Sequence, residues 1–528
     1  MATGNGLTEG VARSRASYAS ARLVQRRSVR VALALSHGLK HGPRAARELL
    51  SSGADELDLP GPPLPMRSRY PQLRIGHLSP VPVTEGVVPG TRLQPDRWRT
   101  IIRRDRPDLV LLDDLAGWDG SGLRELVANL TVPVFTWSSL EAQLRDSGID
   151  PRRLLRLPGG VSAHRVDSQE SSPVGLPPQP SGEVRTLDVS QYPESGSSPN
   201  AGASPGRDDV LVIRDNDSAR IDQMIAWLAR GAVTVAPRDE RFAALLGPVA
   251  DTLLAPGRDL DELAHDLTEP SRWERTSVRA RRYVHVHRSR EAFVDRLLET
   301  CGFNVTASPR ISVLLCTRRQ YHLEHALQQI GRQEHADIEV ILGLHGIDLP
   351  DDRVLERAGR PTRVVRVPRD RPLGVVLNAA LHEASGTLIA KMDDDDHYGA
   401  NHLSDLLVAL QYSQADVVGR WSNAVYLEKE DRTVHTGLEH QERWATHLPG
   451  ATMLARGDVL RRLGWRNVPN AVDTELVRSI ISDGGLVYST HRFGFIRHRH
   501  GDHTFARTDR GFRGAQATPG LARDVLDV

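Results

Sequence analysis

The C-terminal part of the chain alternates short apolar runs with longer segments that have helical periodicity. Mostly apolar runs lie at 310–319, 337–346 and 387–396, and helical spacing of apolar residues occurs at 322–333 and 372–386. Buried parallel strands read as nearly continuous apolar runs, whereas amphipathic helices repeat every 3.6 residues. The pattern therefore predicts an α/β domain whose parallel sheet is covered by helices on both faces.

The same alternation occurs twice nearer the N-terminus. A buried strand is expected at 29–38, followed by a helix at 42–54, and a helix–strand pair is expected at 98–114. Strands and helices resume at residue 209, and this second set closes with a long helix over 275–302. We therefore expect two Rossmann-like α/β regions ahead of the C-terminal domain.

The segment 165–208 differs from both of its neighbours because it is rich in Ser, Pro and Gly and has few large apolar residues. Such a segment cannot bury enough apolar surface to offset the entropy lost on ordering, so we interpret it as a linker. The predicted organisation is a disordered leader (1–28), a Rossmann-like region (29–164), the linker (165–208), a second α/β region (209–303), the C-terminal domain (309–506) and a tail (507–528).

The composition is that of a globular protein without a strong electric field. Of the 528 residues, 39% are hydrophobic and 26% charged, and 68 basic against 67 acidic groups leave a net charge of +1. We therefore expect no nucleic-acid partner. Nearly all the basic residues are Arg, with Lys only at 40, 391 and 429, which indicates a coding bias more than RNA binding.

The cysteine count and the hydropathy bear on the compartment. Only Cys301 and Cys316 are present, too few for a disulfide framework in so long a chain, and this favours a reducing compartment. No run of about 18 apolar residues occurs, so no transmembrane segment is expected. We expect a cytoplasmic protein that is at most peripheral at the inner membrane face.

Four adjacent carboxylates, Asp393 to Asp396, follow the apolar run at 387–392. Ligands of open α/β sheets collect beyond the carboxyl ends of strands, and hard cations such as Mg²⁺ and Mn²⁺ prefer carboxylate oxygens. In an extended chain alternate side chains share a face, so Asp393 and Asp395 are expected to converge on one side. The alternative is a solvated acidic loop, with Asp396 as the N-cap of the next helix.

The order of motifs around this acidic run resembles the family-2 glycosyltransferases, which have the GT-A fold. In the chain's own order the motifs are CTRR, RPLGVVLNAALHEASG, MDDDD, HLPGATMLARGDVLRRLGW, NAVDTELVRSIISDGG and FGFIRHRHGDHTF. The resemblance covers residues 309–506. It implies a hexosyltransferase-type enzyme that uses a nucleoside-diphosphate sugar as donor and Mn²⁺ or Mg²⁺ as cofactor.

The resemblance also implies roles for individual residues. Asp473 would be the general base, with Glu475 a substitute, and Asp395 the principal metal ligand. Asp393 would face the ribose or the metal, and His500, or else His498 or His503, would complete the metal shell or grip the diphosphate. The implied nucleotide-binding residues are Thr317, Arg318, Arg319, Arg371, Gly374, Asn378, Asp393 and Asp394.

The chemistry supports these roles without the family. Displacing a nucleoside diphosphate from the anomeric carbon creates negative charge on the leaving oxygen, which a bridging metal stabilises. A carboxylate on the opposite face activates the incoming hydroxyl, so one direct displacement inverts the anomeric centre. Two alternatives stay open: Asp473 as a plain helix N-cap, and the histidines as part of a polar surface strand. A zinc site would lack the usual Cys ligands.

The pattern departs from that of the family-2 glycosyltransferases at one turn. Where family members carry an Asp-Asp-Gly-Ser-like turn this chain has LGLHGID, with His345 and Gly346, so the base of the nucleotide stays undecided.

The two N-terminal regions resemble GT-B glycosyltransferases but lack the Glu-x7-Glu signature. After the first predicted strand, His37 and Gly38 are either a remnant ligand contact or a plain βα turn.

Two other functions compete with sugar transfer. A nucleotidyltransferase also uses a strand-end acid pair and Mg²⁺, but it would carry a Gly-rich loop where this chain has CTRRQYH. A non-catalytic sugar-nucleotide-binding scaffold would keep the fold without turnover. The acceptor, whether a glycan, a lipid-linked sugar, a protein or a small molecule, is not indicated by any motif.

Overall fold

The structure is a computed structural model. It describes residues 75–78, 90–107, 109–112, 115, 117–130, 134–137, 141–149, 155–157, 185–188, 209–214, 218–255, 259–289, 292, 295, 298–299, 309–335, 337–350, 359–501 and 517–528. Within these ranges no helix combines the length and the apolar character needed to cross a membrane. The predictions for 29–38 and 42–54, and for His37, Gly38 and His503, lie outside the described residues.

The first α/β region contains a five-stranded parallel sheet with the order β2-β1-β3-β4-β5. The helix and strand predicted at 98–114 are confirmed as α3 and β3, because the apolar side chains of this stretch point into one core. The elements are β1 Ile75–His77, β2 Gly90–Arg92, α3 Trp98–Asp105, β3 Leu109–Leu112, α4 Gly120–Asn129, β4 Val134–Trp137, α5 Glu141–Asp146 and β5 Leu155–Leu157.

The second α/β region, called the middle domain below, has a parallel sheet with the order β6-β7-β8-β9. Its first strand lies inside the predicted linker, so the linker prediction is wrong at 185–188, where the backbone pairs with β7. The elements are β6 Arg185–Asp188, β7 Asp209–Val212, α6 Ser218–Ala229, β8 Val233–Pro237, α7 Glu240–Leu246, α8 Ala250–Leu253, β9 Leu254–Ala255, α9 Leu260–Asp266 and α10 Pro270–Arg288.

The C-terminal domain is built on an eight-stranded mixed sheet with the order β12-β11-β10-β13-β19-β15-β20-β18. Its strands are β10 Ile311–Thr317, β11 Ile338–His345, β12 Thr362–Val367, β13 Leu388–Met392, β15 Val417–Gly419, β18 Arg443–Trp444, β19 Leu454–Arg456 and β20 Val487–Ser489. The strands β12, β11, β10 and β13 run parallel, so their carboxyl ends meet at one edge. The strands predicted within 310–319, 337–346 and 387–396 are confirmed as β10, β11 and β13.

Helices cover both faces of this sheet, as the alternation of the strands requires. Val313 of β10 belongs to the core formed with α12 and α15, whereas its neighbour Leu314 belongs to the core formed with α14, α16 and α17. The helices are α12 Leu323–Gly331, α14 Leu373–Glu383, α15 His402–Ser413, α16 Gly457–Leu463 and α17 Val472–Ser482.

A second, smaller sheet flanks the edge of the C-terminal domain that carries the acidic run. It has the order β14-β21-β16-β17-β22, and its last strand belongs to the segment predicted as a tail. That prediction is wrong for 517–528, because β22 pairs with β17 and Val525 and Val528 are buried. The strands are β14 His397–Tyr398, β16 Asn423–Leu427, β17 Arg432–Thr436, β21 Phe495–Arg499 and β22 Ala517–Pro519.

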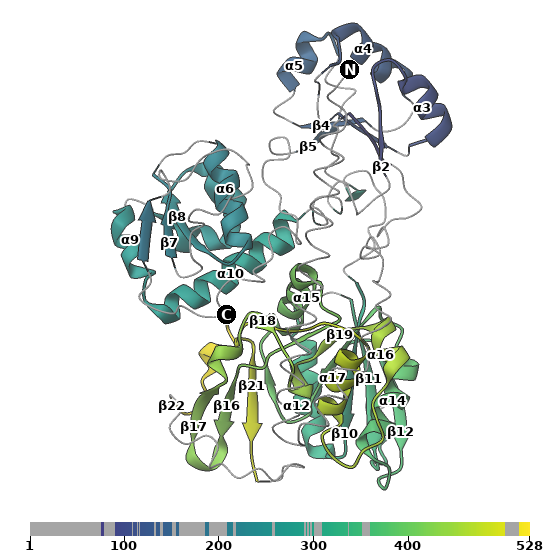
Figure 1. Ribbon diagram of the computed structural model, residues 1–528, viewed down its shortest axis with the longest axis vertical. Helices are drawn as coiled ribbons and strands as arrows, with labels where there is room; N and C mark the ends of the chain where they lie inside the picture. The colour runs from purple at the N-terminus through teal and green to yellow at the C-terminus, as the bar shows by residue number, and fades with distance from the viewer. Residues whose placement is uncertain are drawn as a thin grey trace, which may run out of the picture.

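The middle domain is joined to the C-terminal domain through α10, which packs against α15 (Figure 1). At the centre of this contact Arg281 of α10 forms an ion pair with Glu442 at 2.5 Å, and both side chains are at most 3% exposed. Glu442 also accepts hydrogen bonds from the hydroxyl groups of Tyr412 and Tyr488, at 2.7 and 2.9 Å. A buried charge is stable only when it is paired and hydrogen-bonded in this way.

Candidate active site

The acidic run and the end of β10 lie at the same edge of the sheet because β10 and β13 are parallel neighbours. Thr317, the last residue of β10, donates a hydrogen bond from its hydroxyl to the carboxylate of Asp394. The same hydroxyl oxygen accepts the backbone N–H of Arg319 at 3.0 Å. Thr317 therefore links the turn after β10 to the turn after β13.

Arg319 is the cation closest to the middle of the acidic run. Its Nη2 donates to Asp395 Oδ2 at 2.7 Å and to Asp394 Oδ1, and its Nε donates to Asp394 Oδ2 at 3.2 Å. Burial opposes the charge, but the two carboxylates raise the pKa of Arg319 above its ordinary value. Arg319 therefore pairs with two of the four adjacent carboxylates, and its single positive charge offsets one of the negative charges.

Lys391 compensates the first carboxylate of the run. It is 5% exposed, and its Nζ lies 2.7 Å from Asp393 Oδ1 and 3.2 Å from Asp473 Oδ2. Burial lowers the pKa of this ammonium group, but Asp393 and Asp473 outweigh burial and raise it. The buried lysine thus joins the acidic run to the predicted general base.

The cation partners of the aspartates do not alternate along the acidic run. Asp393 pairs with Lys391, whereas Asp394 and Asp395 both pair with Arg319. The strand β13 ends at Met392, so the two-residue period of an extended chain no longer holds over 394–396. Asp393 and Asp395 therefore have different cation partners, and their convergence on one side stays a prediction.

Asp396 is not a helix cap, so that interpretation is wrong. The helix α15 begins at His402 and its N-cap residue is Asn401. The Oδ1 of Asp396 instead accepts the backbone N–H of His498 at 2.9 Å, and its carbonyl oxygen lies 2.9 Å from His325 Nε2. Burial and then the neighbouring carboxylates of Asp395 and Asp393 raise the pKa of Asp396 well above its usual range.

Asp473 lies in the first turn of α17, after an N-cap residue, Ala471, that has a left-handed φ of 59°. Its Oδ1 accepts the indole N–H of Trp465 at 3.4 Å. A Cβ added at Gly450 would lie 1.8 Å from Asp473 Oδ2, so the absence of a side chain at this position makes room for the carboxylate. Asp473 is therefore not the N-cap, and three groups, counting Lys391, fix its side chain.

Glu475 occupies a different environment from Asp473. It lies two residues after Asp473 on α17, and it forms ion pairs with Arg478 at 2.6 Å and with Arg466 at 3.7 Å. These partners are largely exposed arginines, with side chains 44% and 65% accessible. The structure therefore gives Glu475 surface partners and gives Asp473 the buried lysine.

His500 follows the end of β21 and meets the acidic run from the second sheet. Its Nε2 lies 2.9 Å from Asp395 Oδ2 and 3.5 Å from Arg319 Nη1. The ring of His322 lies 5.3 Å from that of His500, centroid to centroid. The other candidate on this strand, His498, points to Glu428, with its Nε2 3.7 Å from Glu428 Oε1.

The residues present fit a divalent cation in part. Two adjacent ligands of an octahedral ion with bonds of about 2.1 Å lie about 3 Å apart, and the 2.9 Å between Asp395 and His500 matches this separation. The same oxygen of Asp395 accepts a hydrogen bond from Arg319, which a bound cation would displace. Among the described residues, no cluster of three or more His, Cys, Asp or Glu side chains is arranged to hold a metal by itself.

The remaining predicted nucleotide-binding residues lie around α14 and at the end of β10. Arg318 and Arg371 are exposed, and the carbonyl oxygen of Arg371 lies 2.8 Å from His345 Nε2. A Cβ added at Gly374 would lie 2.4 Å from the carbonyl oxygen of Arg466, so this glycine permits close packing. The side-chain amide of Asn378 donates to and accepts from the backbone of Trp465 at 2.8 Å each.

Three residues that fix the site were missed in the sequence. Lys391 carried a signal, since it is one of three lysines in an arginine-rich chain and stands two residues before Asp393. The hydroxyl of Tyr398 accepts the backbone N–H of Asp393 at 2.8 Å and donates to Ala451 O at 3.1 Å. Neither Tyr398 nor Gly450 carried a signal, because the contacts of Tyr398 with Ala451 and of Gly450 with Asp473 join residues that are distant in sequence.

Comparison with known proteins identifies the class of the C-terminal domain. Residues 312–458 match the family described as Glycosyl transferase family 2. The match supports a glycosyltransferase domain in this part of the chain. No curated protein matches the chain.

Solved structures of glycosyltransferases resemble part of the chain. One is the mannosyltransferase PcManGT from Pyrobaculum calidifontis in complex with GDP-Man and Mn²⁺, with 18% identity, 39% of this chain and 59% of that chain covered, and a TM-score of 0.31. Another is S. aureus TarS 1–349 in complex with UDP-GlcNAc, with 16% identity, 38% and 63% covered, and a TM-score of 0.31. The chain thus spans about three fifths of the length of these proteins, and a likeness this low carries no argument about the site.

Proposed function

We propose that the chain is a metal-dependent, inverting glycosyltransferase that moves a sugar from a nucleoside-diphosphate sugar to an acceptor hydroxyl. The observation that carries the proposal is the bridge from Asp393 through Lys391 to Asp473. It holds a candidate base at the same sheet edge as the acidic run, where ligands of α/β sheets bind.

Asp473 is the general base of this proposal. Its carboxylate takes the proton of the acceptor hydroxyl while that oxygen attacks the anomeric carbon and the bond from this carbon to the diphosphate oxygen breaks. A single displacement of this kind inverts the anomeric centre. Lys391 and Trp465 orient the carboxylate through their contacts with its two oxygens.

The acidic run and its cations receive the donor. Asp395 and His500 would hold Mn²⁺ or Mg²⁺, which when bound supplies positive charge to the leaving diphosphate. Asp393 and Asp394, with Thr317 and Arg319, would line the nucleotide pocket. Arg319 is poised to exchange its carboxylate partners for phosphate oxygens, because a guanidinium binds both with the same fork of donors.

The other parts of the chain belong to the same proposal in a supporting role. The two N-terminal parallel sheets would be GT-B-like modules without a catalytic function of their own. The low cysteine count favours action in the cytoplasm. We leave the nucleotide, the sugar and the acceptor open, since no residue of the described site selects among them.

The test is a turnover screen of nucleoside-diphosphate sugars with Mn²⁺ and with Mg²⁺. Wild type is expected to release nucleoside diphosphate from at least one donor, and Asp473→Asn and Asp395→Asn are expected to abolish this release. The control is Asp458→Asn, because the side chain of Asp458 is 70% exposed and lies at the start of α16. The proposal fails if wild type neither binds nor cleaves a donor with either metal.

A nucleotidyltransferase would give a different result. It would release pyrophosphate from a nucleoside triphosphate and a sugar phosphate, and it would not consume a nucleoside-diphosphate sugar. Assaying both products in one screen therefore separates the two activities.

A further inference from the structure

One face of α10 carries a row of arginines that hold the last residues of the described chain. Arg275 Nη1 donates to the carbonyl oxygen of Asp524 at 2.7 Å, and Arg279 Nη2 donates to that of Asp527 at 2.8 Å. Residues 275, 279 and 282 are spaced by four and three positions, so they share one side of the helix. The middle domain thus binds the segment 521–528 of the C-terminal domain through hydrogen bonds from α10.

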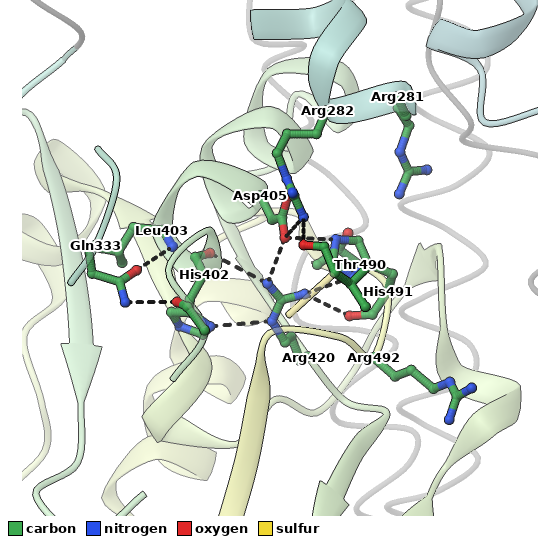
Figure 2. A network of polar contacts seen from close by, with 12 residues as sticks. Arg281, Arg282, Gln333, His402, Leu403, Asp405, Arg420, Thr490, His491 and Arg492 are labelled. Atoms are coloured by element: carbon green, nitrogen blue, oxygen red, sulfur yellow. Dashed lines mark hydrogen bonds and ion pairs between the residues drawn. The ribbon is translucent and has the colours of Figure 1, made fainter. Parts of the chain in front are cut away.

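Arg282 makes the deepest of these contacts. Its Nε and Nη2 donate to the two carboxylate oxygens of Asp405 at 2.6 and 3.1 Å, and Nη2 also donates to Val528 O at 2.5 Å. Figure 2 shows Asp405 between Arg282 above and Arg420 below, and Arg420 and His491 lie 3.6 and 3.4 Å from Asp405 Oδ2. Asp405 lies in the first turn of α15, so the middle domain holds the start of this helix.

The segment 521–528 in turn supports the backbone that follows the acidic run. A Cβ added at Gly399 would lie 2.2 Å from Leu526 O, so the two backbones are in close contact. Gly399 donates its N–H to Gly494 O at 3.0 Å, and Gly494 donates its own to Val525 O at 2.8 Å. Only His397 and Tyr398 lie between Gly399 and the last carboxylate of the run.

The same backbone is also bound by Gln333, which lies two residues beyond the end of α12. The Nε2 of Gln333 donates to Gly399 O at 2.9 Å, and its Oε1 accepts the N–H of Leu403 at 3.1 Å (Figure 2). The turn between the acidic run and α15 is therefore contacted both by Gln333 of its own domain and by a segment that α10 holds in place.

We propose that Arg282 is a positioning residue for the acidic run, so that the middle domain completes the sugar-transfer site. Arg282 fixes α15 through Asp405 and fixes 521–528 through Val528, and these two elements bound the turn between the acidic run and α15. The consequence for turnover rests on the function proposed above, whereas the effect on the geometry of the turn does not.

Amide hydrogen exchange in the full chain tests the proposal directly. Two amides report on the acidic run: Asp393 N–H donates to the Tyr398 hydroxyl, and His498 N–H donates to Asp396 Oδ1. In Arg282→Ala both are expected to exchange faster by on the order of tenfold, the change that corresponds to the loss of one charge-assisted hydrogen bond. Amides of β10 and β11 are expected to keep their wild-type rates.

Matched variants separate positioning from general loosening. Arg272→Ala lies on the same helix, but the Arg272 side chain is 64% exposed and its ion-pair partner at 4.0 Å, Asp266, lies in the middle domain itself. In Arg272→Ala the two reporter amides are expected to exchange at the wild-type rate. Arg282→Lys keeps the charge without the two-point contact and is expected to give an intermediate rate, which also decides the matter if Arg282→Ala does not fold.

Two results would overturn the proposal. One is an unchanged exchange rate at both reporter amides. The other is an equal rise across β10, β11 and the reporters, which would make Arg282 a structural contact only. Where a donor has been found, Arg282→Ala is also expected to lower kcat more than it raises KM for the donor. If wild type turns over no donor, the sugar-transfer function fails, but the exchange experiment still decides the positioning role.

Discussion

The Nζ atom of Lys391 lies 3.2 Å from the Oδ2 atom of Asp473, although Lys391 belongs to β13 and Asp473 to α17. The same ammonium group binds Asp393 at 2.7 Å. One buried cation therefore sets the distance between the acidic run and the candidate base.

We expect Lys391→Met to lower turnover about a hundredfold, because the two carboxylates lose the cation that orients them. The free energy of unfolding should fall by about 1 kcal/mol, since two partly exposed carboxylates lose their cation. Steady-state kinetics and urea denaturation measure the two effects. Lys429→Met is the control because Lys429 is exposed, and equal activity of both variants would contradict the prediction.

Gly450→Ala is expected to displace the carboxylate of Asp473, because the added Cβ would lie 1.8 Å from Oδ2. We expect kcat to fall at least about tenfold, since a shift of about 1 Å in a catalytic group has effects of that size or larger. The control is Gly331→Ala, where a Cβ meets no atom within 4 Å. A Gly450→Ala enzyme with wild-type kcat would show that the position of Asp473 is not critical.

Chelation of divalent metal with EDTA is expected to stop turnover, and added Mn²⁺ or Mg²⁺ should restore it. In His500→Ala the metal concentration for half-maximal turnover should rise about tenfold or more, because one candidate ligand is lost. His382→Ala, an exposed histidine at the end of α14, serves as the control. A titration curve that is the same in both variants would remove His500 from the metal site.

Glu442→Ala is expected to destabilise the contact between the middle and C-terminal domains. Arg281 would keep its buried charge without a carboxylate, which costs about 3 to 5 kcal/mol. Urea denaturation measures the change in the free energy of unfolding. Asp483→Ala breaks the partly exposed pair with Arg462 and should cost less than about 1 kcal/mol, so equal losses in the two variants would contradict the prediction.

Acid is expected to weaken the middle domain through His285. Burial first, and then Arg281, lower the pKa of this imidazole from 6.5 to about 4, against the opposing effect of its hydrogen bond to Ala229 O. Between these two values the unfolded chain binds the proton and the folded chain does not, so stability falls as the pH falls. This one group should lower the free energy of unfolding by about 2 kcal/mol between pH 7 and pH 5.

The variant His285→Gln removes the titrating group and keeps an amide donor. Its free energy of unfolding should depend less steeply on pH over the same interval than that of wild type, as measured by urea denaturation at several pH values. Parallel pH profiles in the two proteins would show that His285 does not titrate in this range.

The elements of the C-terminal domain followed from local patterns. The runs at 310–319 and 387–396 and the helical spacing at 372–386 predicted β10, β13 and α14, because a strand buried on both faces and a helix buried on one face leave different periods in the sequence. Patterns of this kind failed for β6 and for 517–528, whose order comes from pairing with distant strands.

The sequence predicted where the acidic run lies in the sheet but not which cations its carboxylates pair with. The strand-end location of Asp393–Asp396 placed the acidic run at the correct edge of the sheet, since parallel neighbours end together. The grouping of Asp394 with Asp395 on Arg319 could not be predicted, because it depends on where β13 ends and how the chain turns after it.

By itself the sequence determined the succession of strands and helices, the edge at which the carboxylates gather and the class of the C-terminal domain, because each of these depends on residues close together in the chain. Only the tertiary structure decided which cation pairs with which carboxylate and how α10 contacts α15 and the segment 521–528. The ion pairs of Arg281 with Glu442 and of Arg282 with Asp405 span 161 and 123 residues. Contacts across such separations leave no local period in the sequence, since they arise only when the packed elements bring the side chains together.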